Sequence, residues 1–290
     1  MHHNKLPGPP RAMGFCGRDS EENFMKNFGN TTATYCAGLS LLLAACAASA
    51  ATCESNSGST RVATLELYTS EGCNSCPPAD RWLSQLMRKK YGPQELVPLA
   101  FHVDYWDDLG WKDRFAQRQF SARQHLLARR NRAQMVYTPQ FLFNGKDLRL
   151  AGADPVLAKR LSAISAQTSS ARINLRQSVT ADQIEIDLTI DVASNRESPE
   201  TEAFVALSEN NLYSEVRAGE NTGRSLAHDF VVRELLGPIP IGPGGKARWS
   251  GKITLAPDWK RQDLALTAFV QDIPHNDILQ ALRTPACNSP

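Results

Sequence analysis

The sequence predicts an α/β domain over residues 61–168, followed by a mostly antiparallel, sandwich-like β domain over residues 169–290. The first prediction depends on two apolar, β-branched runs that flank a helix-like segment, and the second on short alternating stretches separated by Gly, Pro and Asn. Residues 1–60 show neither pattern. We expect them to be largely disordered and to hold an export or lipoprotein signal, with residues 53–60 as a tether.

Composition places the chain among globular proteins and limits its partners. Its 290 residues are 42% hydrophobic and 21% charged, which is enough for one large or two ordinary domains. The net charge of +2 argues against a general polyanion binder, so we expect no nucleic-acid partner. The seven cysteines are too scattered for a small disulfide scaffold and complete no zinc motif, so we expect no metal or other cofactor.

Residues 36–51 form an apolar stretch that is too short to span a bilayer but suits an export signal. Counted from Met25, the segment has ordinary signal length, which predicts that translation starts there. Residues 43–46 resemble the lipobox of bacterial lipoproteins, in which the cysteine, here Cys46, is lipidated and attaches the chain to a membrane. The alternatives are an ordinary signal cleaved slightly later, or an unprocessed cytoplasmic chain. Either signal predicts a periplasmic or secreted protein, where disulfides persist.

A Cys-x-x-Cys pair, Cys73 and Cys76, stands between a strand predicted over 62–68 and a helix predicted over 77–90. A thiol at a helix N-terminus meets unpaired peptide N–H groups and the positive end of the helix dipole, which stabilise a thiolate. We therefore expect Cys73 to be an exposed nucleophile. Cys76, one turn further on, is expected to close a disulfide with it.

A second strand, predicted over 96–103, completes a β-α-β unit and hence a parallel pair with a right-handed crossover. The carboxyl end of this strand is dense in aromatic and acidic residues, and open α/β sheets build their sites at such ends. The side chains expected to support the dithiol are Glu71, His102, Asp104 and Trp106.

The segment 112–132 predicts a helix with a basic stripe, which is more often solvated than used to bind an anionic partner or lipid headgroup. The stripe consists of Arg114, Arg118, His125, Arg129 and Arg132. Next, Thr138 and Pro139 lead into a strand that turns at residues 144–145. A return strand and a helix over 154–166 complete the domain.

This order of elements, with the dithiol after the first strand and Thr138-Pro139 before the third, resembles the thioredoxin fold. The resemblance implies a cis Thr138-Pro139 bond that faces the dithiol and presents backbone to an extended substrate. Several segments are closer still to a bacterial family of predicted secreted thioredoxin-like proteins, catalogued as domain of unknown function 1223. Those segments are 71–80, 102–107, 137–140, 219–221 and 269–272.

The chain departs from thioredoxin at two places near the dithiol. Residues 74–75 are Asn-Ser where thioredoxin has Gly-Pro, and Leu67 stands where thioredoxin has a buried Asp. Glu66 is adjacent but faces the other side of the strand, because side chains alternate. The proton acceptor for Cys76 is then expected among Glu71, His102, Asp104 and water.

The second half predicts half-buried antiparallel strands. They cover residues 173–176, 184–190, 203–207, 230–233, 247–255 and 264–270. A Pro- and Gly-rich segment, 237–245, predicts an exposed loop. The polar pairs 228–229 and 220–221 are expected to be structural, because no Ser or Cys nucleophile in a motif accompanies them. Cys287 is expected to pair with Cys53 if the two ends of the chain meet.

The leading functional hypothesis is an extracytoplasmic thiol–disulfide oxidoreductase that acts on a protein or a small thiol or disulfide. Cys73 would attack the partner disulfide, and Cys76 would resolve the mixed disulfide. A first alternative is a Cu(I)-binding protein, with the two thiolates joined by a His102 nitrogen. A second alternative is a non-catalytic interaction protein in which the dithiol is a structural disulfide.

Overall fold

The computed structural model describes residues 51–149, 153–193 and 200–287, of which 44% lie in strands and 21% in helices. In the first half the elements are β1 (Ala51–Asn56), β2 (Ala63–Thr69), α1 (Pro77–Lys89), β3 (Leu96–His102), η1 (Asp104–Leu109), α2 (Arg118–Arg130), β4 (Gln140–Phe143), β5 (Lys146–Leu148) and α3 (Ala153–Ser165). In the second half they are β6 (Ala171–Val179), β7 (Gln183–Val192), β8 (Thr201–Glu209), β9 (Leu212–Glu215), β10 (Ser225–His228), β11 (Val231–Pro240), β12 (Lys246–Thr254), η2 (Arg261–Asp263), β13 (Leu264–Asp272) and β14 (Ile278–Pro285).

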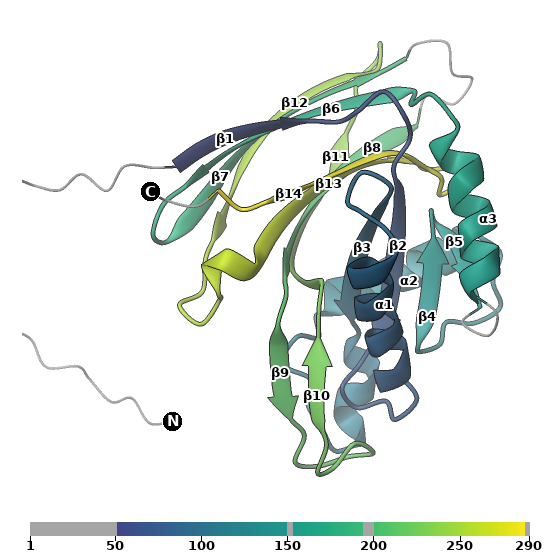
Figure 1. Cartoon of the computed structure of the whole chain (residues 1–290), viewed down its shortest axis with the longest axis vertical. Helices are drawn as coiled ribbons and strands as arrows, with labels where there is room; N and C mark the ends of the chain where they lie inside the picture. The colour runs from purple at the N-terminus through teal and green to yellow at the C-terminus, as the bar shows by residue number, and fades with distance from the viewer. Residues whose placement is uncertain (1–50, 150–152, 194–199, 288–290) are drawn as a thin grey trace, which may run out of the picture. The chain divides into compact units, whose positions relative to one another are not determined.

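A mixed eight-stranded sheet runs through both halves of the sequence, in the order β14-β13-β8-β11-β3-β2-β4-β5 (Figure 1). Strands β2 and β3 are parallel, as the β-α-β unit predicts, and β4 pairs antiparallel with β2. The junction between the halves is β11, which runs parallel to β3 where Val231 pairs with Ala100. There the backbone N–H of Ala100 donates to the carbonyl of Phe230 over 2.9 Å.

The predicted fold class, an α/β thioredoxin-like domain followed by a separate β domain, is therefore wrong. The protein is mostly β, with one mixed and one antiparallel large sheet. Strands from both sides of the predicted domain boundary at 168–169 share the large sheet, and the boundary itself stays a prediction. The physical reason is the edge of β3: an unpaired strand edge needs hydrogen-bond partners, and the second half of the chain supplies them.

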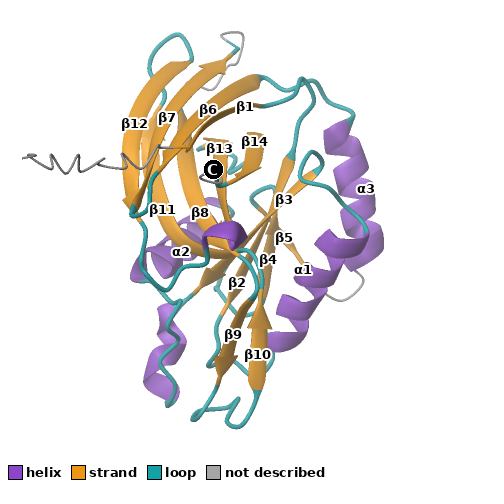
Figure 2. Ribbon diagram, turned by 60° about the vertical axis from the view of Figure 1, so that its left-hand side comes forward, coloured by secondary structure: helices purple, strands orange, loops and turns teal. Residues whose placement is uncertain are grey.

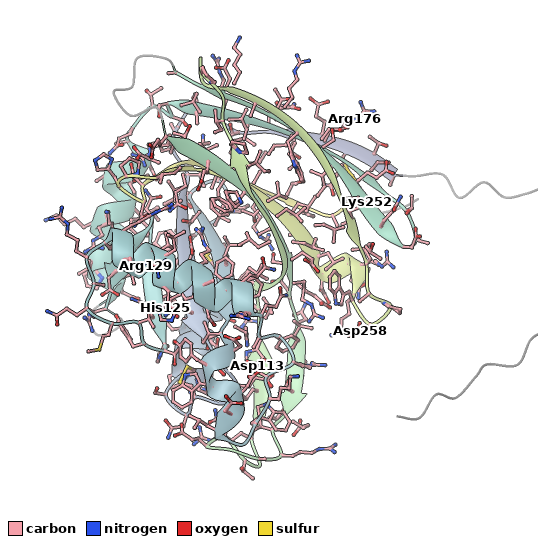
Figure 3. The ribbon with its side chains drawn as sticks, turned by 180° about the vertical axis from the view of Figure 1, so that it is seen from behind. Asp113, His125, Arg129, Arg176, Lys252 and Asp258 are labelled. Atoms are coloured by element: carbon pink, nitrogen blue, oxygen red, sulfur yellow. A yellow bond between two sulfur atoms is a disulfide. The ribbon has the colours of Figure 1, made fainter. Side chains whose placement is uncertain are left out.

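A second, antiparallel sheet of order β1-β6-β7-β12 packs its apolar face on the β14-β13-β8 part of the large sheet (Figure 2). Its strands alternate in burial, so that Leu175 and Ile253 face the core between the sheets. Their neighbours Arg176 and Lys252 are exposed on the outer face (Figure 3). The strand β11 continues to Pro240, through part of the segment expected to be a loop.

The predicted tether over 53–60 begins as strand β1, which pairs with β6 from Ala51–Val179 to Asn56–Asn174. The expected disulfide between Cys53 and Cys287 is confirmed, and it closes the two ends of the described chain on each other. The predicted start at Met25, the export signal and the lipidation of Cys46 lie outside the described residues.

Helices cover both faces of the β3-β2-β4 region. Leu65 and Leu67 of β2 pack with α1 and α3 on one face, whereas Tyr68 packs with α2 on the other. The helix α2 begins at Arg118 rather than near 112, because the Asp113 carboxylate accepts the backbone N–H of Phe115 over 2.9 Å and holds a turn there. All residues of the predicted basic stripe are exposed, including His125 and Arg129 (Figure 3).

A buried ion pair joins α2 to the large sheet. Arg123 donates to Glu66 of β2 over 2.6 Å, and the side chains are 6% and 0% exposed. The guanidinium also lies 4.9 Å from the ring centre of Phe204 and 5.2 Å from that of Phe269, which belong to β8 and β13. Glu66 thus faces α2, as its place in the strand predicts. Arg123 links β2 of the first half to β8 and β13 of the second half.

A hairpin of β9 and β10 extends beyond the sheet and lies beside α1 (Figures 1 and 2). Its strands pair from Ser225–Glu215 to His228–Leu212. Gly219 and Gly223, in the connection between the strands, have positive φ values of 71° and 80°, a backbone conformation that favours glycine. This hairpin places second-half residues against the start of α1.

Candidate functional site

Cys73 and Cys76 are joined by a disulfide at the N-terminus of α1, and their Cα atoms are 5.4 Å apart. Cys76 is the N-cap residue, and its carbonyl accepts the backbone N–H groups of Ala79 and Asp80 over 2.8 and 3.2 Å. The two prolines that follow occupy the first helical turn, where a missing N–H costs little. The local sequence therefore fixes the dithiol at the positive end of the helix dipole.

The expectation that Cys73 is exposed is wrong: both cysteines are 0% exposed. The β9–β10 connection is bound to the backbone around the dithiol. Asn221 donates its side-chain amide to the carbonyls of Cys73 and Glu71 over 3.0 and 2.8 Å, and Glu220 accepts the backbone N–H of Asn74 over 3.0 Å. A turn that lies about 150 residues further along the chain is therefore held against the dithiol segment, and local pattern reasoning does not detect such a contact.

Glu71 lies directly before the dithiol and is fully buried. Its carboxylate accepts the indole N–H of Trp111 over 2.7 Å, and its other oxygen lies 3.4 Å from Nε2 of His228. Burial and the Asp113 charge raise the pKa of Glu71, but the His228 imidazole, the Ser214 hydroxyl and the Trp111 indole together more than offset this, and the pKa is lowered. Glu71 is therefore held as a carboxylate.

His102, at the end of β3, pairs with Asp113 over 2.6 Å, and neither side chain is exposed. Asp113, labelled in Figure 3, also accepts the backbone N–H of Glu71 over 2.9 Å. Burial lowers the pKa of His102, but the Asp113 carboxylate outweighs it and the pKa is raised. For the same reason the pKa of Asp113 is lowered despite its burial. The imidazole of His102 meets that of His228 edge to face, with ring centres 5.0 Å apart.

Asp80 lies one helical turn after Cys76 and is 7% exposed. Its carboxylate accepts the hydroxyl of Thr69 over 3.2 Å and lies 4.0 Å from Nδ1 of His228. Burial raises the pKa of Asp80, and the attraction of His228 and of His102 offsets this only in part. Asp80 therefore carries its charge less readily than an ordinary aspartate.

Trp106 connects the dithiol turn to the Thr138-Pro139 segment. Its indole N–H donates to the Thr138 hydroxyl over 2.7 Å, and a Cβ added to Gly72 would lie 3.1 Å from the Cβ of Trp106. Glycine at position 72 therefore allows this close packing. The Thr138-Pro139 bond is cis, as predicted. Asp104 instead binds Ser121 of α2 through its carboxylate and its backbone N–H.

Within the described residues, no group of three or more His, Cys, Asp or Glu side chains is arranged to hold a metal ion. The two cysteines of the Cu(I) hypothesis are bonded to each other. Among the same described residues, no helix is both long and apolar enough to cross a membrane.

A family model described as "Protein of unknown function (DUF1223)" matches residues 64–271. The chain belongs to this family. The predicted membership of the DUF1223 family is thus confirmed, whereas the thioredoxin-like and secreted character expected with it stays a prediction. A search of curated protein sequences finds no match to this DUF1223 protein.

Two solved structures resemble this DUF1223 protein in fold. One is a structural-genomics crystal structure of an Agrobacterium tumefaciens protein, with 24% identity, a TM-score of 0.53, and coverage of 78% of this chain and 95% of that one. The other is HBP35 of Porphyromonas gingivalis, with 14% identity, a TM-score of 0.61, and coverage of 79% and 76%. At these identities the likeness concerns the fold alone.

The structure brings Glu71 and His102 of this DUF1223 protein into one buried cluster around the dithiol, and links Trp106 to Thr138. Asp104 lies apart, with Ser121. The sequence reasoning missed four members of the site. They are Asp80, Asp113, Asn221 and His228. Asp80 had a usable signal, because it follows Cys76 by four residues in a helix, whereas the others depend on tertiary contacts.

Proposed function

We propose that this DUF1223 protein is an extracytoplasmic thiol–disulfide oxidoreductase with Cys73 and Cys76 as its redox pair. The observation that carries the proposal is the concentration of buried ionisable side chains around the disulfide. They are Glu71, Asp80, His102, Asp113 and His228. Burying such groups costs free energy that a structural crosslink does not require, and clusters of perturbed ionisable groups are typical of functional sites.

The chemistry is an exchange of two electrons between sulfur pairs. The Cys73 thiolate attacks a substrate disulfide, forms a mixed disulfide and releases the first substrate sulfur as a thiolate that takes a proton. The Cys76 thiolate then attacks the sulfur of Cys73 and releases the second substrate sulfur. The protein dithiol is oxidised, the substrate disulfide is reduced, and the reverse sequence runs with an oxidised protein and a substrate dithiol.

Access to Cys73 requires the 219–223 turn to move aside. The turn is held over the dithiol by the side chains of Asn221 and Glu220, and a glycine with positive φ lies at each of its ends. We infer that the described state is the covered one. In the open state, the Thr138-Pro139 segment would present its backbone to a disulfide-containing protein or small molecule, with Trp106 beside it.

The proposed extracytoplasmic location is supported by the disulfides Cys53–Cys287 and Cys73–Cys76, since such bonds persist in oxidising compartments. Attachment to a membrane through Cys46 stays a prediction from sequence. Intact mass of the protein taken from its membrane fraction tests it. A lipidated Cys46 as the first residue supports the prediction, and a chain that still begins before Met25 contradicts it.

Complete burial of Cys73 and Cys76 favours one other candidate, a non-catalytic interaction protein in which this disulfide only fixes the start of α1. The two candidates differ in whether the bond opens. An oxidoreductase exchanges it with substrate, whereas the interaction protein keeps it closed under the conditions of its compartment.

Turnover of insulin disulfides, with dithiothreitol as electron donor, tests the proposal directly. The wild type is expected to turn over, Cys73→Ser to lose turnover, and Cys76→Ser to accumulate a mixed disulfide visible in intact mass. The matched control is the double variant Cys53→Ser/Cys287→Ser, which removes the other disulfide of the described chain and should keep turnover. A wild type with no more activity than Cys73→Ser would contradict the proposal.

A further inference from the structure

The resolving cysteine, Cys76, needs a proton acceptor, because only a thiolate attacks a disulfide and burial in apolar surroundings disfavours that form. The side chains expected as acceptors have charged or polar neighbours, but Oε1 of Glu71 and Nε2 of His102 have no hydrogen-bond partner in the described structure, so position rather than availability singles out an acceptor. Asp104 binds Ser121 of α2, and His102 uses Nδ1 to bind Asp113 over 2.6 Å. Glu71 accepts the indole N–H of Trp111 and has its remaining oxygen directed to His228.

Asp80 has the right position for this proton. Cys76 has helical backbone angles, φ −77° and ψ −39°, and the backbone N–H of Asp80 donates to its carbonyl. Side chains four residues apart in a helix lie on the same face with Cβ atoms about 5–6 Å apart. Asp80 is 7% exposed, so its carboxyl group stays on the buried side of α1 together with the sulfur.

His228 lies between Asp80 and a route to solvent. Its Nδ1 is 4.0 Å from the Asp80 carboxylate, its Nε2 is 3.4 Å from Glu71, and neither nitrogen has a hydrogen bond in the described structure. His228 also lines a cleft of about 250 Å³ between α1 and the β9–β10 hairpin, together with Arg81 and Arg88. His228 is thus the member of the buried cluster that adjoins this cleft.

We propose that Asp80 is the proton acceptor for the Cys76 thiol and that His228 passes the proton to solvent through the cleft between α1 and the β9–β10 hairpin. This inference rests on the proposed oxidoreductase function. It assigns to the hairpin, beyond covering the dithiol, a part in the chemistry of the resolving step.

The step balances as follows. The S–H bond of Cys76 breaks, the Asp80 carboxylate takes the proton, and the resulting thiolate forms a bond to the sulfur of Cys73. The bond between Cys73 and the substrate sulfur breaks, and that sulfur leaves with the electron pair. Asp80 then returns to its carboxylate by giving the proton to His228, and the imidazole releases it to water in the cleft.

The groups around Asp80 determine how strongly it holds the proton. Thr69 of β2 donates to it, His228 approaches from β10 and His102 from β3, and the negative charge of Asp113 acts against its ionisation. Glu71 lies beyond His228, on the dithiol turn. Burial together with Asp113 keeps the pKa of Asp80 above its usual value, closer to the value that an efficient base near neutral pH needs.

The test is the rate at which the reduced, full-length protein is oxidised by glutathione disulfide, measured from pH 5 to pH 10. Asp80→Asn is expected to slow the reaction about tenfold or more at pH 7. The difference in rate between this variant and the wild type should disappear above about pH 9, because there the thiol ionises without a base. His228→Gln should slow the oxidation by a smaller factor in the same pH range.

Asp154→Asn is the matched control, since it removes an acidic charge from α3 that pairs with Lys90 at the surface. It should follow the wild-type profile. The inference would be overturned if the Asp80→Asn rates equalled those of the wild type, or were lower by the same factor at every pH. The oxidoreductase function would then still stand. A wild-type dithiol that does not react at any pH would overturn the function and the inference together.

A measurement on the wild type covers the case in which Asp80→Asn does not fold. The Asp80 carboxyl carbon is followed by NMR as the pH is changed, in the oxidised and in the reduced protein. Coupling to the Cys76 thiol should move its titration midpoint between the two states. Identical midpoints would show that Asp80 does not exchange a proton with the dithiol, and the inference would fail.

Discussion

The side-chain amide of Asn221 donates to the carbonyl oxygen of Cys73 over 3.0 Å, across 148 residues of sequence. The oxygen of the same amide accepts the guanidinium of Arg224 over 3.0 Å, so the amide is held on both sides. Through this contact the second half of the chain is bound to the backbone of a disulfide that the first half carries.

Asn221→Ala should therefore speed the reduction of the Cys73–Cys76 disulfide by tris(2-carboxyethyl)phosphine. The variant leaves the carbonyls of Cys73 and Glu71 without their partner, which removes roughly 2 kcal/mol from the covered state and predicts a rate roughly tenfold or more above wild type. Arg217→Ala, an exposed change in the same hairpin, is the control and should react like wild type. An Asn221→Ala rate equal to that of the control would contradict the covering role of the turn.

Asp80→Asn should stabilise the oxidised fold at neutral pH. Burial raises the pKa of Asp80, so the folded state disfavours the carboxylate. The resulting loss of folding free energy is absent below the unfolded pKa of about 4, where Asp80 is protonated in both states. It is fully present above the folded pKa. Asn removes the charge and keeps an oxygen for Thr69, so the free energy of unfolding should rise by about 1 kcal/mol at pH 7 and not at pH 3.5. Urea unfolding at both pH values measures this, and an equal change at the two values would exclude the charge as its cause.

The His102–Asp113 pair predicts a window of maximal stability. Asp113, whose pKa is lowered, contributes stability above its unfolded pKa of about 4 and loses it as the pH falls through the folded value. His102, whose pKa is raised, contributes fully below its unfolded pKa of about 6.5 and loses this as the pH rises through the folded value. The melting temperature should therefore be highest between about pH 4 and 6.5 and decline above it. Asp113→Asn should flatten the decline, and a decline of unchanged size would refute the assignment.

Arg123→Ala should cost about 3–5 kcal/mol of unfolding free energy, because it leaves the buried Glu66 carboxylate without its counter-ion. Arg129→Ala on the same helix removes an exposed guanidinium and should change stability by no more than about 0.5 kcal/mol. Chemical denaturation of both variants measures the difference. Similar costs for the two would show that the buried pair does not hold α2 on the sheet.

Local signals in the sequence are sufficient to predict the β2-α1-β3 unit. Cys76 and the two prolines after it are an N-terminal helix signal, and the apolar runs on each side have strand length. The pairing of Cys53 with Cys287 likewise followed from two cysteines near the ends of a compact chain. Such features depend on neighbours in sequence or on very few alternatives, which is why they could be predicted.

The rest depends on contacts between residues far apart in the chain. The parallel pairing of β11 with β3 rests on one register position, Val231 with Ala100, and no sequence pattern indicates it. The strands of the β9–β10 hairpin have four residues each, too few for a reliable alternation, so the sequence does not indicate the contact of this hairpin with Cys73. His228 is next to Asp229 in sequence but faces Glu71 and Asp80 in space. Its sequence neighbours therefore do not indicate that it belongs to the site.

The reduction potential of the Cys73/Cys76 couple tests the central claim most directly. The full-length protein is equilibrated with glutathione buffers of known ratio, and free thiols are alkylated and counted by mass, with Cys53→Ser/Cys287→Ser used to assign the signal. A redox-active pair predicts a potential between about −270 and −120 mV, within the range of exchanging dithiols. A potential below about −300 mV, with the bond closed in every buffer of its compartment, would contradict the oxidoreductase account and identify a structural disulfide.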